Sequence, residues 1–280
     1  MPRVTEKFSY WMLVLPALAI MVIFYIVPVL GIWKIAFTEP VTGFGNFEKM
    51  AASSAVQTSF IITFRVAAVT TVGCLLLGYI VAYAISNYAS RLTPLMVALV
   101  ILPFWVSVLI RSFSWIVLLG RSGIVNDALR DAGLIDAPLK LMHNEFGVVI
   151  AMIHVMLPFA VLPMLTNMRG ISGAYVQAAR SLGASEWYAF RNVYFPQTMP
   201  GVMSGALLVF VLSLGFYVTP ALLGGGRVLM ISEYITYQIQ EFLNWGLGSA
   251  LSVALLVATA LVLLVAARFV NLRATLLDRK

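Results

Sequence analysis

The sequence has few charged residues, and this scarcity indicates the class of protein. Of the 280 residues, 10% are charged and 61% are hydrophobic. A soluble domain carries about 25% charged residues, because its surface must be hydrated. The shortage excludes a soluble enzyme, a coiled coil and a disordered chain. It predicts a polytopic membrane protein.

Residues that carry chemistry are also scarce. Cys74 is the only cysteine, which excludes an internal disulfide and a cysteine-ligated metal centre, and a small buried hydrophobe is its simplest interpretation. The two histidines, His143 and His154, do not form a His-x-x-x-His pair. A phosphate-binding loop of the P-loop type needs a Gly-Lys pair, and the sequence contains none. We therefore expect no catalytic, cofactor-binding or metal-binding residue, and no ATP site, in this chain.

Six apolar segments are long enough to cross a bilayer, which takes about 20 residues of helix. The predicted spans are residues 8–33, 66–90, 92–110 (continuing towards 119), 146–168, 202–226 and 250–267. The fifth is expected to begin near Val202, because Pro196 and Pro200 precede it. The first apolar stretch exceeds the 7–15 residues of a signal-peptide core, so we expect it to be an uncleaved span. No Asp or Glu lies within the six segments.

Basic residues predict the orientation, since cytoplasmic loops of membrane proteins are richer in Lys and Arg. With the N-terminus inside, six spans return the C-terminus to the same side. The cytoplasmic segments then hold Arg3, Lys7, Arg91, Arg169, Arg180, Arg191, Arg268, Arg273, Arg279 and Lys280, and the outer segments hold Lys49, Arg121, Arg130, Lys140 and Arg227. Lys34, Arg65 and Arg111 fall near outer ends of spans, where long side chains reach the interface.

The connection between the fourth and fifth spans, residues 169–201, is too long for a simple turn. Ser172 and Ser185 are typical N-caps, and each precedes a stretch of good helix formers. Gly183 between them suits the left-handed residue that closes a helix. The segment predicts a helix, a glycine turn and a second helix on the cytoplasmic side.

The second of these helices has an aromatic face. Trp187, Phe190 and Tyr194 recur at helical spacing, and Pro196 is expected to end the element. Aromatic groups outside the membrane need a surface to bury against. Two interpretations are open: the face packs on the protein's own helix ends or in the headgroup region, or it binds a partner.

Residues 177–183 read Gln-Ala-Ala-Arg-Ser-Leu-Gly, and residues 193–196 read Val-Tyr-Phe-Pro. This resembles the EAA loop of binding-protein-dependent ABC importer permeases, in which Glu-Ala-Ala is followed by a glycine, a β-branched residue and a proline at fixed distances. The chain departs from the pattern at Gln177, which keeps the length of Glu without its charge, and at Phe195, which replaces Leu. Short strings at 102–105, 109–113, 133–136, 157–159 and 222–225 resemble the spermidine/putrescine branch of that family.

The resemblance implies an all-α membrane protein with the type I importer permease fold: six transmembrane helices, both termini inside, and a cytoplasmic helix-turn-helix coupling element. Residues 1–58 would form the first span and outer loop, and residues 59–280 the permease core with the coupling loop 169–201. The implied partners are a second homologous permease in a heterodimer, two ATP-binding subunits that hold ATP and Mg, and an extracytoplasmic solute-binding protein. The implied location is the bacterial cytoplasmic (inner) membrane, with lipid and no nucleic acid as surroundings. The coupling residues would be Gln177, Ala178, Ala179, Arg180, Leu182, Gly183, Trp187 and Pro196.

The mechanism expected is alternating access, in which closure of the ATP-binding subunits moves residues 177–196 and rotates spans three to five. Spans interrupted by Pro or Gly often line a translocation path. Aromatic faces can bind an amine through cation–π contacts of about 0.5–2 kcal/mol. The candidate pathway residues are Trp105, Arg111, Trp115, Phe216 and Tyr217. For these aromatic residues, a lipid-facing or packing role is equally consistent with the sequence.

The sequence does not identify the solute. A polyamine favours a carboxylate, and the spans contain none. Either the paired permease supplies the acid, or the solute is an opine, an amino-acid derivative or another polar compound. A self-contained secondary transporter is disfavoured by the same lack of intramembrane acids. A membrane enzyme is disfavoured because no nucleophile–base or metal pattern is present.

Overall fold

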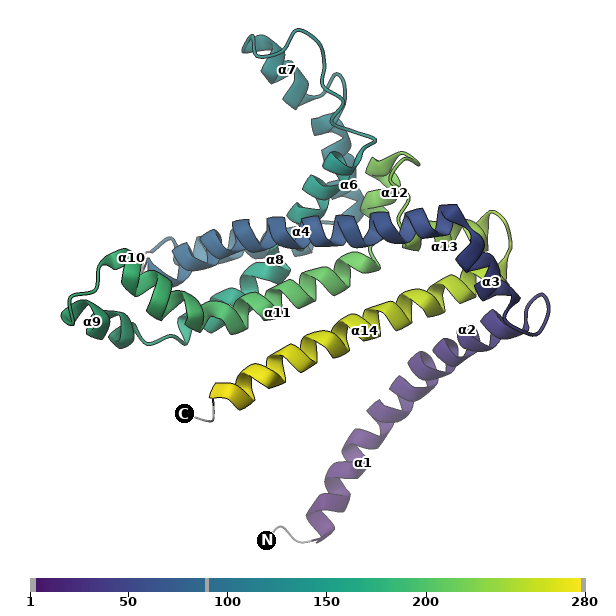
Figure 1. Cartoon of the computed structure of the whole chain (residues 1–280), viewed down its shortest axis with the longest axis horizontal. Helices are drawn as coiled ribbons and strands as arrows, with labels where there is room; N and C mark the ends of the chain where they lie inside the picture. Colours follow the sequence, from purple (N-terminus) through teal and green to yellow (C-terminus); the bar gives the residue numbers. More distant parts are fainter. Residues whose placement is uncertain (1–3, 89–90, 278–280) are drawn as a thin grey trace. The chain divides into compact units, whose positions relative to one another are not determined.

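The computed structural model describes residues 4–88 and 91–277, and within these ranges the chain is helical and contains no strand (Figure 1). Within this described part of the chain, six helices are long and apolar enough to cross a membrane, the number that the sequence predicts. The chain divides into two units, one of residues 1–57 and 234–260 and one of residues 58–233 and 261–280. Arg3, Arg279 and Lys280 of the charge count, and Ser90 of the second predicted span, lie outside the described residues.

The first unit begins with a continuous helical run. Helix α1 (Val4–Met21), the π-helical turn η1 (Val22–Ile26) and α2 (Val27–Thr38) come one after another without a break. In the most apolar window of the span Val14–Thr38, no residue is buried within the chain. An apolar helix of this kind needs lipid or another chain around it. The first unit thus contains an apolar span whose most hydrophobic part is not covered by other residues of the chain.

The anchored end of that span is held by α3 (Gly45–Ala52). Asn46 is buried, and its Nδ2 donates to the carbonyl oxygens of Ala36 at 2.9 Å and Glu39 at 2.6 Å. The start of α14 (Trp245–Leu277) approaches the same turn so closely that a side chain at Gly246 would collide with the carbonyl of Glu39. The end of α2 is therefore fixed by hydrogen bonds and by close backbone packing.

The second unit is organised around α8 (Glu145–Arg169), the most buried of the six candidate spans. It packs against α11 (Phe195–Leu214), where Gly201 and Gly205 face it at a spacing of four residues. A Cβ added at Gly205 would lie 3.0 Å from the carbonyl oxygen of Ala160, and one at Gly201 would lie 2.7 Å from the Cβ of Asn167. Small residues at such a spacing let two membrane helices approach closely.

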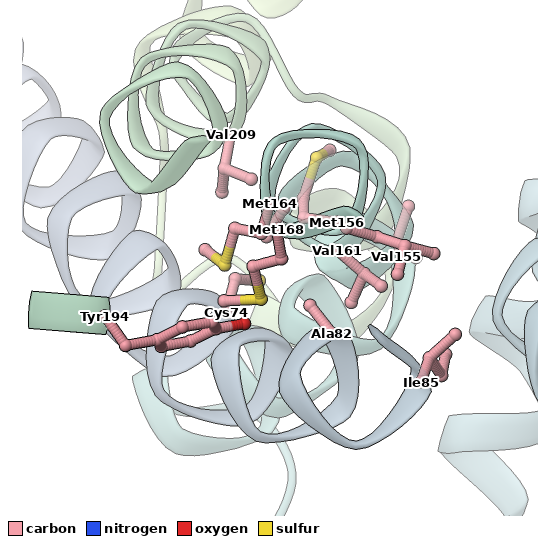
Figure 2. Close-up of a cluster of buried hydrophobic side chains, with 12 residues drawn as sticks. Cys74, Ala82, Ile85, Val155, Met156, Val161, Met164, Met168, Tyr194 and Val209 are labelled. Atoms are coloured by element: carbon pink, nitrogen blue, oxygen red, sulfur yellow. The ribbon is translucent and has the colours of Figure 1, made fainter. Parts of the chain in front are cut away.

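A methionine-rich core joins α8 and α11 to α4 (Ser54–Asn87) (Figure 2). Met156, Met164 and Met168 of α8 are buried here, together with Cys74 of α4. The cysteine is fully buried and its Sγ lies 3.6 Å from the carbonyl oxygen of Ile153, so it occupies the core as the small hydrophobe that the sequence predicts. A second buried cluster surrounds Met152 and Met230.

The bounds predicted for the third span, residues 92–110, are wrong, because this stretch is not one continuous helix. The chain forms α5 (Thr93–Ile101), a 3₁₀ turn η2 (Leu102–Trp105) and then, after a break, α6 (Val108–Leu119). Pro103 interrupts the helical hydrogen bonds, and Val106 and Ser107 adopt extended ψ angles of 129° and 139°. Arg111 therefore lies in the first turn of α6, and not near the far end of a helix that begins at residue 92.

The predictions at the start of the fifth span are also wrong. Helix α11 begins at Phe195 and not near Val202, and Pro196 does not end the preceding element. A π-helical turn, η3 (Phe190–Tyr194), leads directly into α11, and Pro196 lies in its first turn. Proline is tolerated there because its missing N–H is not needed, and the π turn shifts the hydrogen-bond register ahead of it. The other end differs too, since α12 (Val218–Gly224) is separated from α11 by residues 215–217.

Candidate coupling element and solute pathway

The segment after α8 folds as two short helices with a tight turn between them. Helix α9 (Gly173–Ser181) begins after Ser172, whose Oγ accepts from the N–H of Ala174 at 3.3 Å. Helix α10 (Glu186–Ala189) begins after Ser185, whose Oγ accepts from the N–H of Tyr188 at 3.2 Å. Both serines are N-caps, as predicted. Their hydrogen bonds fix where each helix starts.

The turn between the helices depends on Gly183. Its φ is +89°, a conformation that residues with a Cβ rarely adopt. Its N–H donates to the carbonyl of Arg180 at 2.9 Å, and the N–H of Ala184 donates to the carbonyl of Ala179 at 3.1 Å. Nothing lies within 4 Å of the position of a Cβ at Gly183. The backbone conformation, and not a lack of space, therefore requires glycine here.

The second helix does not end before the fifth apolar span begins. Helices α10, η3 and α11 form one unbroken helical path over Glu186–Leu214, 29 residues long. The part beyond Phe195 packs along α8, at the interface that contains Gly201 and Gly205. A displacement of the turn at Gly183 would therefore be carried into the core of the unit along a helix, which resists bending far better than a loop.

The aromatic face of this helix packs partly on the protein itself. Tyr194 is buried, and its hydroxyl accepts from Asn87 Nδ2 at 2.9 Å at the end of α4. The ring of Tyr83 meets those of Phe190 and Tyr194 edge-on at 5.6 and 5.5 Å. Trp187 stacks on Phe190 but keeps 67% of its surface exposed. Phe190 and Tyr194 of the aromatic face thus pack against α4, while most of the surface of Trp187 remains exposed.

The tip of the element presents large apolar side chains to the surroundings. Leu182 is 89% exposed, and Tyr175, Trp187 and Tyr188 are each more than half exposed. Of the predicted coupling residues, Ala179 alone is half-buried, while Gln177, Ala178, Arg180, Leu182, Gly183, Trp187 and Pro196 are exposed. Arg180 bridges the two helices through an ion pair with Glu186 at 2.7 Å. Exposed apolar groups gathered in this way mark an interaction surface.

Two of the predicted pathway residues lie inside the second unit on α6. The Nε1 of Trp115 donates to Nδ1 of His154 on α8 at 3.2 Å, so His154 is a hydrogen-bonded, half-buried residue of the helix bundle. Arg111 is half-buried, and among the residues that the structure describes its Nε and Nη1 find no hydrogen-bond partner. A guanidinium inside a membrane span is costly unless a counter-charge meets it.

The other pathway candidates are divided between the interior and the surface. Phe216 lies in the break between α11 and α12, where it packs against both buried clusters. Trp115 packs against one of the same clusters, so the structure brings Phe216 and Trp115 to one region. Tyr217 is 40% exposed and Trp105 is 87% exposed, and neither belongs to these clusters.

Sequence reasoning missed a buried carboxylate. Glu233 is 2% exposed and lies in the first turn of α13 (Ile231–Gln240), outside the six predicted spans. The N–H of Ile231 donates to Thr63 Oγ1 at 2.8 Å, and Ser232 Oγ donates to the carbonyl of Phe216 at 2.7 Å. These bonds hold the start of α13 against α4 and the break at Phe216. The available signal was weak: one charge within the otherwise uncharged stretch 228–240.

Known proteins are similar to this chain in sequence. The spermidine/putrescine transport system permease protein PotB of Haemophilus influenzae is 38% identical over 185 residues, covering 66% of this chain and 65% of that protein. The PotB of Escherichia coli K12 is 33% identical over 189 residues, covering 68% of this chain and 69% of the relative. The match thus spans about two thirds of the length of these relatives.

Solved structures of importers have the same fold. A bacterial ABC transporter involved in the import of the acidic polysaccharide alginate contains a chain with a TM-score of 0.75 and 18% identity, and the match covers 95% of this chain and 96% of that one. The structure of the bacterial alginate transporter in complex with an alginate pentasaccharide-bound periplasmic protein also matches, with a TM-score of 0.74 and 18% identity over 94% of both chains. The family described as "Binding-protein-dependent transport system inner membrane component" matches residues 74–280. The chain belongs to this family of multi-pass inner-membrane transport components.

Proposed function

We propose that this chain is a transmembrane permease subunit of an ATP-driven importer, and that its solute is a small amine-containing compound of the polyamine class. The observation that carries the proposal is the unbroken helix from the exposed turn at Gly183 into the packed core of the second unit. The spermidine/putrescine permeases among its relatives support the class of solute.

The proposed assembly contains a second, related permease, two ATP-binding subunits and an extracytoplasmic solute-binding protein. The periplasmic protein bound in one related structure supports the last of these. The distribution of Lys and Arg supports a cytoplasmic location of both termini, and α9 and α10 would then lie on the cytoplasmic side. ATP and Mg would be bound by the partner subunits, and this chain would bind no cofactor.

In the proposed mechanism, the chain converts closure of the ATP-binding subunits into movement of its spans. The exposed apolar tip around Leu182 and Trp187 would bury against the ATP-binding partner. Closure would push α10, and the helix 186–214 would carry the displacement to α8, because Gly201 and Gly205 keep the two helices in close contact. Alternating access results when these helices rotate as a rigid group.

Glu233 offers the negative charge that a polyamine requires. Its carboxylate is carried by a short helix hydrogen-bonded to the backbone of Phe216, one of the aromatic residues expected in the pathway. A buried carboxylate near an aromatic ring can hold an ammonium group by charge and by cation–π contact, worth about 0.5–2 kcal/mol for the ring alone. We therefore assign solute recognition to Glu233 together with Phe216 and Trp115.

The proposal is tested by ATP-dependent uptake of labelled spermidine in proteoliposomes that contain the assembled transporter. We expect Glu233→Gln to raise the spermidine concentration for half-maximal uptake by about tenfold, the loss of one charge-assisted contact, and Glu233→Asp to retain much of the activity. The exposed Glu241 on the same segment supplies the control, because Glu241→Gln should leave uptake unchanged.

Two results would contradict the proposal. Uptake by the purified chain alone, without ATP or partner subunits, would identify a secondary transporter. The solute-binding protein of the same system could also bind an opine or an amino-acid derivative and no polyamine. That result would show that the proposed class of solute is wrong.

A further inference from the structure

A basic cavity lies in the second unit, between the end of α6, the loop before α8 and the turn after α12. This end of α8 is opposite to the end that leads to α9 and α10 (Figure 1). It has a volume of about 470 Å³. Three of its lining residues carry a permanent positive charge, and none is acidic. The lining residues are Leu119, Arg121, Leu139, Lys140, Leu141, Met142, His143, Gly225 and Arg227.

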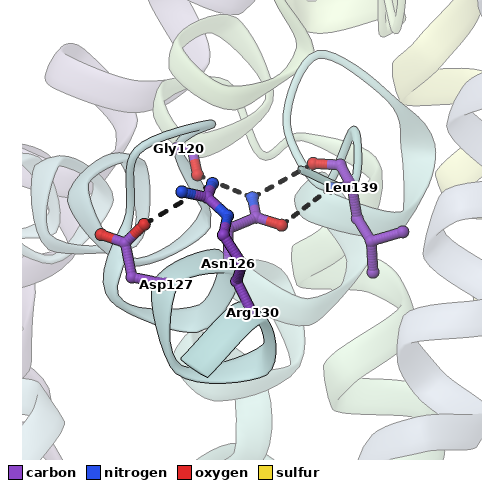
Figure 3. Close-up of polar contacts among 5 residues, drawn as sticks. All are labelled: Gly120, Asn126, Asp127, Arg130 and Leu139. Atoms are coloured by element: carbon purple, nitrogen blue, oxygen red, sulfur yellow. Dashed lines mark hydrogen bonds and ion pairs between the residues drawn. The ribbon is translucent and has the colours of Figure 1, made fainter. Parts of the chain in front are cut away.

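The cavity is held together by Asn126 of α7 (Ile124–Asp131), which is fully buried (Figure 3). Its Nδ2 donates to the carbonyl oxygens of Gly120 at 2.9 Å and Leu139 at 3.2 Å. Its Oδ1 accepts from the N–H of Leu139 at 2.8 Å. One amide thereby clamps together the two stretches that carry Arg121 and Lys140.

The third stretch of the cavity is fixed by His143. Its N–H donates to the carbonyl of Leu223 at 3.0 Å, which ties this loop to the end of α12. The imidazole lies directly over Gly225, where any Cβ would overlap it. His143 itself has a φ of 57°, unusual for a residue with a side chain. The contact positions Arg227, two residues further on, at the same cavity.

The charges of the cavity are not neutralised within the described part of the chain. Arg121, Lys140 and Arg227 are exposed, and none takes part in an ion pair there. Asp127 pairs with Arg130 and Glu145 pairs with Arg65, and the other two acids of this stretch, Asp131 and Asp136, do not line the cavity. Like charges that converge on one cavity attract an anionic group and repel a cationic solute.

We propose that the basic cavity receives acidic side chains of the solute-binding protein. This rests on the proposed function, in which the cavity lies on the outer side and the solute is a polyamine. A protein that captures a polyamine gains from carboxylates around the opening of its solute site, because they attract the ammonium groups and are not neutralised by the bound solute. The surface around that opening is then negatively charged, and it complements a cavity that is lined by three cations and no acid. The cavity repels the free solute and attracts its carrier.

The test measures ATP hydrolysis by the assembled transporter in nanodiscs of neutral lipid, as a function of the concentration of the purified, spermidine-loaded solute-binding protein. Arg121→Gln combined with Arg227→Gln should raise the half-saturating concentration about tenfold and leave the maximal rate unchanged, because charges at an interface act mainly on encounter. The same double variant should lose much of the dependence on salt that the unmodified complex shows. Arg227→Lys should behave as the unmodified chain.

Arg130→Gln is the control, because Arg130 is an exposed cation of the nearby helix α7 that does not line the cavity. A double variant that behaves like this control would overturn the inference, and so would a fall in maximal rate at an unchanged half-saturating concentration. A shift seen only in nanodiscs of anionic lipid would assign the cavity to a headgroup, which also overturns it. If the binding protein does not stimulate ATP hydrolysis by the unmodified complex, the proposed function itself is wrong. If it stimulates the unmodified complex and the double variant equally, only the role of the cavity is wrong.

Discussion

Replacing Gly183 by valine tests whether the turn between α9 and α10 carries mechanical work. The φ of +89° penalises any residue with a Cβ by about 1–2 kcal/mol, and β-branching adds to the penalty. Because nothing lies within 4 Å of the added Cβ, no steric clash accompanies the strain. The free-energy penalty is therefore confined to the turn, and it corresponds to roughly a tenfold loss in the population of the intact turn. The membrane-spanning core should assemble normally.

The chain contains a matched control at Gly133. Its φ is +68°, its added Cβ also meets nothing within 4 Å, and its turn has the same two hydrogen bonds. The N–H of Gly133 donates to the carbonyl of Arg130, as that of Gly183 donates to the carbonyl of Arg180. Gly133→Val thus imposes the same kind of strain at a turn outside the coupling element.

The assay compares ATP-dependent spermidine uptake with the yield of assembled complex. We expect Gly183→Val to reduce uptake by at least about tenfold, in line with the loss of the turn, with an unchanged yield of complex. Gly133→Val should retain uptake. Normal transport by Gly183→Val would refute the coupling role, and an equal loss in both variants would show that strain at any turn is sufficient.

Buried contacts elsewhere in the chain give three more expected outcomes. Asn126→Ala leaves the backbone groups of the basic cavity unsatisfied, at about 1–3 kcal/mol, and limited proteolysis should become faster between residues 119 and 144. Gly205→Leu cannot fit against α8 and should lower the thermal midpoint of the complex, whereas Gly31→Leu, which meets open space in α2, should not. Arg111→Leu should reduce co-purification of the second permease, because a partner's carboxylate is the counter-charge that the partly buried guanidinium needs, and Arg111→Lys should partly restore it.

The features that the sequence predicts well are those set within a few neighbouring residues. An N-cap needs one serine and the N–H two or three residues later, so Ser172 and Ser185 could be identified without any tertiary information. The same is true of Gly183, whose role depends on its own φ. The fourth span is bounded by Glu145 and Arg169, and the helix ends at those residues.

The features that could not be predicted depend on contacts between distant segments or on small changes of helical register. Pro103 indicates an interruption within the apolar run from 92 to 119, but hydropathy does not show that Val106 and Ser107 are extended, because a helix and a broken helix have the same hydropathy. The burial of Glu233 depends on the anchoring of Ile231 to Thr63, 168 residues away. The place of Pro196 inside a helix depends on the π turn before it, which is a deviation of one residue in hydrogen-bond register.

The two glycine turns show why the coupling role cannot be assigned from a local motif alone. Gly133 and Gly183 each lie three residues after an arginine, close their helices with the same hydrogen bonds and have equally open surroundings. The difference lies in the chain beyond each turn. After Gly133 the chain forms no further helix until residue 145, and such a segment absorbs displacement by changing its own dihedral angles. After Gly183 the chain enters the 29-residue helical run that packs along α8, where we expect a shift at one end to move the other. We therefore expect mechanical work to pass through the second turn and not through the first.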